Sequence, residues 1–258
     1  MNPRRSPLPK DVGSLPPLPA EFDERLSAGF DALAIDLPPD ARSKLVDHVR
    51  LLLAWNESIN LTAIRDPVAA ATAHVVGSLS AVPLLRREGV RAFLDLGSGG
   101  GFPGIPLAVA LPADRAVLVE SIGKKARFLE TAVRATGLAG IVEVRAQRAE
   151  ELAATGGGRR GWPAVVARAV ASLPDLVELA FPLLAIRGIL VAWKRLPIDD
   201  ELEAGRRALE AQAGSVPEIH PVTIDGLESH VLVTARKLRA SPSRSGPSQR
   251  RPRDTTRR

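Results

Sequence analysis

The stretch FLDLGSGGGFPGIPLA (residues 93–108) joins two apolar segments through a run rich in glycine. Residues 90–96 are short and apolar, as in a buried strand, and the segment from Gly104 onward is expected to form a helix. Pro106 falls in the first turn of that helix, where proline is tolerated. The glycines can adopt positive φ and let a ligand lie against the backbone. This order predicts the first unit of an open α/β sheet, with a ligand at the carboxyl end of the strand.

Strands and helices are expected to alternate over the rest of the chain. The expected strands are 90–96, 116–121, 141–147, 163–170, 188–194, 216–224 and 228–238, and the expected helices are 104–111, 124–136, 173–186 and 198–213. Such alternation predicts a Rossmann-like α/β fold with a doubly wound, mostly parallel, seven-stranded sheet. The last two strands have no helix between them, so we expect an antiparallel hairpin at one edge.

The chain divides into four regions by composition. Residues 1–20 are rich in proline and are expected to be disordered. Residues 21–88 carry helical apolar spacing throughout and are expected to form an N-terminal helical cap. Residues 89–239 are expected to form the ligand-binding domain. Residues 240–258 are rich in arginine and are expected to form a basic disordered tail.

The composition excludes several classes of protein. The chain has no cysteine, which excludes disulfides, thiolate metal ligands and a cysteine nucleophile. Its four histidines are scattered, so no metal site is expected. No apolar run approaches the roughly 18–20 residues that cross a bilayer, and no signal peptide is seen. We therefore expect a cytoplasmic protein without a membrane contact. Most of the net charge of +6 lies in the tail, which suits RNA phosphates or a solubilising end.

The glycine run fits two classes of cofactor. Gly99, Gly101 and Gly104 match G-x-G-x-x-G, the dinucleotide pattern, which alone is a weak signal. A second frame begins at Asp95 and continues through Gly97 and Gly99 to Gly101. An acidic start is typical of sites for S-adenosylmethionine (SAM), which is cationic, whereas a carboxylate there would disfavour a pyrophosphate. Both frames remain open at this point.

Two further acids stand near the ends of the next strands. Glu120 follows the loop by about twenty residues, and a carboxylate there can accept both hydroxyls of a ribose from either cofactor. Taken alone it can also be a solvated strand end, but its register with the loop favours the ribose. The third strand runs into AQRAEEL (residues 146–152), where Glu150 can lie near an adenine or simply begin a helix.

The chain resembles the bacterial 16S ribosomal RNA guanine-N(7) methyltransferases, called RsmG or GidB. The resemblance covers residues 40–237 and rests on the order and spacing of NESINLTAIRDP, HVVGSL, FLDLGSGGGFPGIPLA, VESIGKKARFLE, RAEEL and ARAVASL. It implies a SAM-dependent methyltransferase that acts on nitrogen-7 of one guanine in the 530 loop of 16S ribosomal RNA. The implied partner is the small ribosomal subunit. Nothing in the sequence indicates an obligate dimer, so we expect a monomer.

The resemblance and the loop argument together predict the site residues. The predicted SAM contacts are Asp95, Gly97, Gly99, Phe102, Glu120, Ala149, Glu150 and Arg168. The predicted RNA contacts are Asn60, Thr62 and His74 in the cap, and Lys124 and Lys125 at the start of a helix.

Guanine nitrogen-7 carries a free lone pair, so its methylation needs no general base. The expected task is to align the lone pair, the methyl carbon and the sulfur, and to exclude water. Arg168 and Lys194, at the ends of the fourth and fifth strands, are the predicted catalytic residues, because a cation can hydrogen-bond the guanine carbonyl. Phe102 is the predicted stacking surface for a base.

The chain departs from the family pattern in three places. Gly77 stands where the family usually has an acid, and Arg195 follows Lys194 where the family usually has glycine. The C-terminus has no tyrosine and lacks the usual Y-P-R-x-x-G segment. Three alternatives remain open: a SAM enzyme for a small molecule or a protein, an NAD-type oxidoreductase, and an RNA-binding protein without activity.

Overall fold

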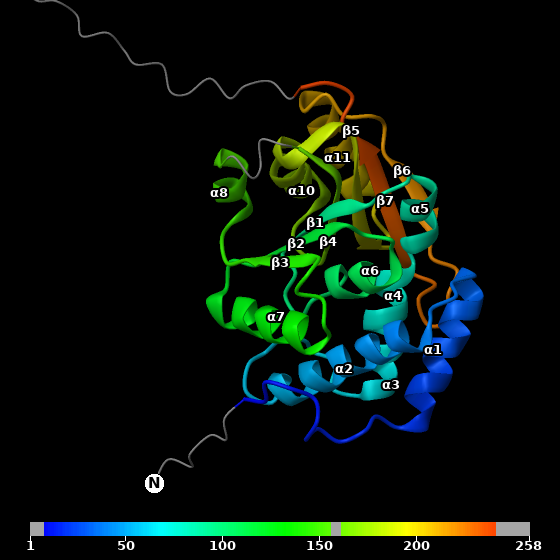
Figure 1. Cartoon of the computed structure of the whole chain (residues 1–258). Helices are drawn as coiled ribbons and strands as arrows, with labels where there is room; N and C mark the ends of the chain where they lie inside the picture. Colours follow the sequence, from blue (N-terminus) through cyan, green and yellow to red (C-terminus); the bar gives the residue numbers. More distant parts are fainter. Residues whose placement is uncertain (1–7, 156–160, 241–258) are drawn as a thin grey trace, which may run out of the picture.

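One seven-stranded sheet organises the computed structural model, which describes residues 8–155 and 161–240 (Figure 1). The strand order is β3-β2-β1-β4-β5-β7-β6. The strands are β1 (Ala92–Leu96), β2 (Arg115–Val119), β3 (Val142–Arg145), β4 (Trp162–Arg168), β5 (Leu184–Arg195), β6 (Glu218–Pro221) and β7 (His230–Arg236). β1 to β5 pair in parallel, and β7 is antiparallel to β5 and β6. The predicted doubly wound, mostly parallel fold and its antiparallel edge are confirmed.

The strand order reverses between β1 and β4, the place where open sheets of this kind bind ligands. Leu96 at the end of β1 is level with Val119 of β2 and with Ala167 of β4. The loops that follow these three strands therefore meet at one edge of the sheet.

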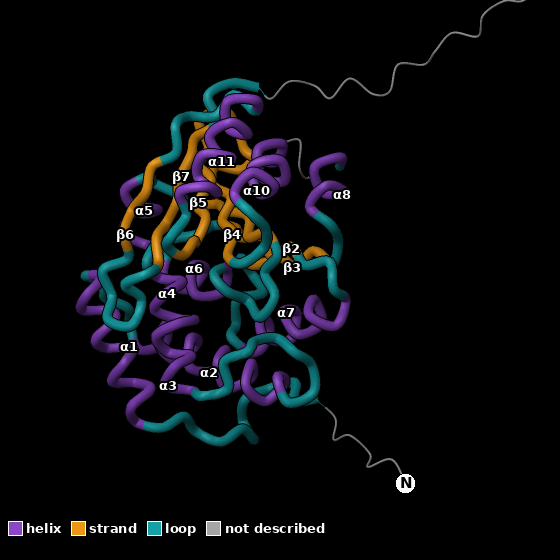
Figure 2. Tube along the Cα trace, turned by 180° about the vertical axis from the view of Figure 1, so that it is seen from behind, coloured by secondary structure: helices purple, strands orange, loops and turns teal. Residues whose placement is uncertain are grey.

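Helices cover both faces of the sheet (Figure 2). One face carries α8 (Ala149–Ala154), α10 (Leu173–Ala180) and α11 (Asp199–Ala211), and the other carries α6 (Gly104–Ala110) and α7 (Gly123–Ala135). Each face has its own apolar cluster. Phe93 and Phe128 are fully buried on the α6 and α7 side, and Phe181 is fully buried on the other.

The N-terminal helices form a further layer over α6 and α7. They are α1 (Ala20–Leu33), α2 (Pro39–Asn56), α3 (Pro67–Ala70), the π-helix η1 (Ala71–Val76), α4 (Gly77–Leu79) and α5 (Val82–Arg87). Leu45, Val49 and Leu52 form the apolar stripe of α2 and are fully buried, because α2 packs on α6 and α7. We call α1 to α5 the cap.

Residues 8–19 contain no helix or strand, yet they lie along α2. Arg50 donates from Nε to the carbonyl oxygen of Pro16 at 3.0 Å and from Nη2 to that of Val12 at 3.0 Å. Trp55 donates from Nε1 to the carbonyl oxygen of Pro9 at 2.8 Å. The expected disorder of residues 1–20 therefore has no support at 8–19. Residues 1–7 lie outside the described residues, as does almost all of the predicted tail.

Two expectations about apolar segments are wrong. The helix expected over 173–186 ends at Ala180, a short 3₁₀-helix follows over Phe181–Leu183, and β5 begins at Leu184. Pro182 lacks an N–H group, so the α-helix does not continue through it. The expectation that no apolar run approaches the length of a membrane span is also wrong, because the helical stretch Pro67–Arg87 is long and apolar enough by length and composition. In the fold, 61% of its apolar window is buried.

Candidate active site

The glycine loop between β1 and α6 has three residues in the left-handed region. Gly97, Gly99 and Gly101 have φ angles of 67°, 53° and 87°, which residues with a Cβ rarely adopt. A Cβ at Gly99 would meet only the carbonyl oxygen of Gly97, at 3.8 Å. The chain at Gly99 is therefore open on the side where a ligand can lie against it.

Other glycines of the loop are required by the protein's own packing, a reason that was not predicted from the sequence. A Cβ at Gly101 would lie 2.7 Å from Nε2 of His48 in the cap. A Cβ at Gly104 would collide with the side chain of Leu118 in β2. These two glycines therefore allow the cap and the sheet to close on the loop.

Glu120 is tied to the glycine loop through its carboxylate. The side chain follows β2 and is only 6% exposed. Its Oε2 accepts from the backbone N–H of Gly99 at 2.9 Å, and its Oε1 accepts from that of Ile122 at 2.8 Å. The acid predicted to bind a ribose therefore stands directly beside the open part of the loop.

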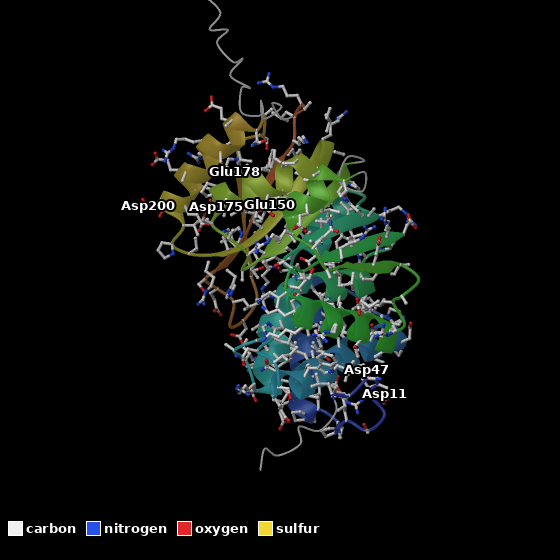
Figure 3. All side chains as sticks on the ribbon, turned by 90° about the vertical axis from the view of Figure 1, so that its left-hand side faces the viewer. Asp11, Asp47, Glu150, Asp175, Glu178 and Asp200 are labelled. Carbon is white, nitrogen blue, oxygen red and sulfur yellow. The ribbon has the colours of Figure 1, made fainter. Side chains whose placement is uncertain are left out.

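A cavity of about 280 Å³ opens at this edge of the sheet. Its lining includes Gly97, Ser121, Gln147, Ala149, Glu150 and Val170. Three of the predicted SAM contacts thus line one cavity, and Nε2 of Gln147 is buried there without a hydrogen-bond partner. Figure 3 shows Glu150 far from Asp11 and Asp47, which lie at the cap end of the molecule. A cavity with a glycine backbone on one side, an unpaired amide and a nearby carboxylate fits an uncharged adenosine joined to a cationic sulfonium.

Asp95 lies beneath the loop and not on its surface. The side chain is fully buried, Oδ2 accepts from the N–H of Gly104 at 3.1 Å, and Oδ1 has no partner. Burial raises the pKa of this carboxyl to about 7, and the negative charge of Glu120 acts in the same direction. Asp95 therefore fixes the start of α6 from beneath the loop, and a role for it at a cofactor stays a prediction.

Phe102 is enclosed by histidines of the cap. Its ring centroid lies 4.5 Å from that of His48 and 4.7 Å from that of His74. The side chain is only 8% exposed. The expectation that Phe102 offers a stacking surface to a base is therefore wrong for this conformation, since other rings already contact it.

Arg168 points from the end of β4 into the cap. Its Nη2 donates to the carbonyl oxygen of Ala73 at 2.6 Å, and its Nη1 lies 3.4 Å from the carbonyl oxygen of His74 and from Oγ of Ser78. Burial lowers the pKa of Arg168 to about 10, so the guanidinium remains charged at neutral pH. A Cβ at Gly77 would lie 3.5 Å from Nη1, so an acid at that position would stand beside the guanidinium.

Two of the three predicted RNA contacts in the cap bond to each other. Oγ1 of Thr62 lies 2.7 Å from Nε2 of His74. Burial, and then the positive charge of Arg168, lower the pKa of His74 to about 4, so its ring is neutral at pH 7. Asn60 is exposed in the same loop. Asn56 was not among the predicted residues, yet its Oδ1 accepts from the backbone N–H of Thr62 at 3.0 Å and fixes this loop.

The predicted lysines lie apart from this cluster. Nζ of Lys194 makes an ion pair with Glu201 at 2.5 Å and donates to the carbonyl oxygen of Ala171 at 2.8 Å. This contact is with α11, on the face of the sheet opposite the cap. Lys124 is exposed and Lys125 is half-buried in the first turn of α7. The structure thus gives Lys194 a structural partner and brings no predicted lysine into contact with Arg168.

Most of the cap, from α2 to α5, and most of the sheet, from β1 to β6, fall within a match to one family model. The model described as rRNA small subunit methyltransferase G (GidB) matches residues 41–230. The chain belongs to this family. Proteins named ribosomal RNA small subunit methyltransferase G are similar to it over most of their length. That of Azoarcus sp. (strain BH72) is 39% identical over 82% of this chain and 95% of that protein, and that of Deinococcus radiodurans is 36% identical over 86% and 87%. The resemblance to GidB is confirmed.

Solved structures of more distant proteins share the fold of this GidB-family chain. A SAM-dependent O-methyltransferase from Thermotoga maritima has a TM-score of 0.50 at 14% identity, covering 74% of this chain and 72% of that one. The branched-chain polyamine synthase of Thermus thermophilus has a TM-score of 0.54 at 16% identity, covering 76% and 64%. At such identities the likeness shows the Rossmann-like α/β fold and nothing more.

Proposed function

We propose that this chain transfers the methyl group of SAM to nitrogen-7 of a guanine in the 530 loop of 16S ribosomal RNA. The observation that carries the proposal is the family match over residues 41–230, which includes most of the cap, the glycine loop and Arg168. Membership in a family of ribosomal RNA methyltransferases removes the NAD-type oxidoreductase as an alternative. The cytoplasm, a monomeric state and the small ribosomal subunit as substrate are parts of the same proposal.

The cofactor residues are proposed from the cavity. SAM carries the methyl group on a positively charged sulfur. The sulfur is a strong leaving group when the methyl group is transferred. Glu120 would accept from the ribose hydroxyls, because a carboxylate oxygen that receives one N–H retains a lone pair for another donor. Gly97 and Gly99 would border the amino-acid part of the cofactor, and Ala149 with Glu150 would border the adenine.

The reaction asks the protein for placement and not for proton removal. The lone pair of guanine nitrogen-7 is free at neutral pH, so no base is required. Neither His48 nor His74 is suited to proton transfer, because burial lowers the pKa of each to about 4. Arg168 is proposed as the residue that positions the cap at the mouth of the site, through its bond to Ala73.

Transfer of labelled methyl tests the proposal. Small subunits from a strain without the gene would be incubated with this protein and SAM that carries a tritiated methyl group. We expect label in 16S ribosomal RNA, and calorimetry should detect binding of SAM and none of NAD. The proposal fails if the RNA stays unlabelled while the protein binds SAM and remains folded.

A further inference from the structure

Strand register places Arg168 and Arg195 on the cap side of the sheet. Arg168 of β4 is level with Trp193 of β5. Trp193 donates from Nε1 to the carbonyl oxygen of Gly77 at 2.7 Å, which fixes its side chain toward the cap. Side chains alternate along a strand, so Arg195, two residues beyond Trp193, lies on the same side about 7 Å further along. His230 of β7 is directly opposite Arg195.

This row carries positive charge that the described residues do not neutralise. Lys194, on the opposite side of β5, is paired with Glu201. Within residues 8–155 and 161–240, by contrast, neither Arg168 nor Arg195 makes an ion pair with a carboxylate. Arg168 is partly buried and bonded to cap oxygens, whereas Arg195 is exposed at the rim. The uncompensated charge therefore reaches solvent at Arg195.

The groups around His230 agree with this placement. Burial lowers the pKa of His230, and the positive charges of Arg195 and Arg168 lower it further. Both guanidinium groups are thus near enough to influence one imidazole. Glu228 is the acid nearest in the chain; its charge acts on the pKa of His230 in the opposite direction, and its Oε1 accepts from the backbone N–H of Gly226 at 2.8 Å. Its carboxylate is bound within its own turn.

We infer that Arg195 binds a backbone phosphate of the substrate RNA beside the target guanine. The inference rests on the proposed function, because a guanine at the mouth near Arg168 brings its own flanking phosphates to this rim. A guanidinium can bind two phosphate oxygens at once, and Arg195 has no carboxylate to give up first. The carboxylate of the cofactor is the other anion that a free arginine at this edge can meet, and the experiment separates the two.

The test compares Arg195→Gln with Arg187→Gln. Arg187 is also exposed and without an ion pair in the described chain. It lies near the start of β5, whereas Arg195 is the last residue of that strand, so the two arginines stand at opposite ends of β5. Three quantities would be measured for each variant and for the parent. They are the KM for small subunits in methyl transfer, the Kd for SAM by calorimetry, and the slope of log Kd for 16S ribosomal RNA against log salt.

For Arg195→Gln we expect a KM for RNA that rises roughly threefold or more, and a salt slope smaller by roughly 0.7 to 1. The Kd for SAM should stay that of the parent, and Arg187→Gln should match the parent throughout. The inference is overturned by an unchanged salt slope in Arg195→Gln, by equal changes in both variants, or by a weaker Kd for SAM with the KM for RNA unchanged. If the parent methylates no ribosomal RNA, the proposed function fails, and the salt slope still decides the role of Arg195.

Discussion

Nη2 of Arg168 lies 2.6 Å from the carbonyl oxygen of Ala73, and this bond joins the end of β4 to the π-helix of the cap. The two residues are 95 positions apart in the chain. Arg168 follows the strand next to the glycine loop, so the bond sets where the cap stands relative to the cavity. π-helical turns occur often at functional sites. This bond is one fixed point between the cap and the sheet, beside the bond from Nε1 of Trp193 to the carbonyl oxygen of Gly77.

Replacing Arg168 with alanine should lower the methyl-transfer rate by roughly 100-fold, because a displacement of about 1 Å can cost that much. The free energy of unfolding should fall by about 1–3 kcal/mol, since the cap carbonyls lose their donor. Rates would be measured with SAM and subunits both saturating, on protein shown to be folded by circular dichroism. Arg168→Lys keeps the positive charge but lacks the planar guanidinium. Its methyl-transfer rate should lie between those of the parent and of Arg168→Ala. An alanine variant that turns over like the parent would remove Arg168 from the account.

Gly99 and Gly101 should respond differently to the same substitution. Gly101→Ala should reduce the free energy of unfolding by roughly 2–4 kcal/mol, because its Cβ meets His48 and φ is positive. Gly99→Ala should cost only about 1–2 kcal/mol, from φ alone. It should instead raise the Kd for SAM at least roughly tenfold, about 1.4 kcal/mol. Denaturant unfolding measures the first effect and calorimetry the second. Equal Kd values for SAM in Gly99→Ala and the parent would contradict the proposal that SAM lies against the backbone at Gly99.

Glu120→Gln should weaken SAM binding by at least roughly tenfold. The substitution turns one acceptor oxygen into an amide group that faces the N–H of Gly99 or Ile122, at a cost of about 1–3 kcal/mol. It also removes an acceptor for the ribose. Glu130→Gln is the matched control, because Glu130 is an exposed acid that does not line the cavity, and the Kd of this variant for SAM should equal that of the parent. If both variants lose the same affinity, Glu120 has no special place in the site.

Asp95 should make stability depend on pH. Its pKa of about 7 in the fold lies above the ordinary value of 3.8. Between these values the folded chain keeps a proton that the unfolded chain has released, so stability falls as the pH rises toward 7. The variant Asp95→Asn has no such proton to keep. The difference in the free energy of unfolding, variant minus parent, should therefore rise by on the order of 2 kcal/mol from pH 5 to pH 8. Urea unfolding at the two pH values is the measurement, and an equal difference at both would show that Asp95 is ionised throughout.

The sequence allowed the sheet, the loop and several lining residues to be predicted, because their signals are local. The buried run before Gly97 and the acid at Glu120 lie at fixed offsets from strand ends, and strand ends meet at one edge. The early start of β5 could not be read, since the apolar run around Pro182 suits a helix or a strand equally well.

The rest of the site depends on contacts between distant segments. Nothing in the sequence shows that His48 fills the space beside Gly101, or that Phe102 lies between two histidines. Positive φ and room for a ligand, the two reasons expected for these glycines, therefore do not cover the packing at Gly101. The partner of Lys194 was missed for the same reason, because the face of β5 on which it lies depends on register.

Mapping the methylated base in 16S ribosomal RNA tests the central claim most directly. Chain cleavage at 7-methylguanine would be compared for RNA from cells with the gene, without it, and without it but incubated with the purified protein and SAM. The account predicts one cleavage in the 530 loop that disappears with the gene and returns with the protein. Cleavage there in all three samples, or methylation restored only at another atom or another base, would contradict it.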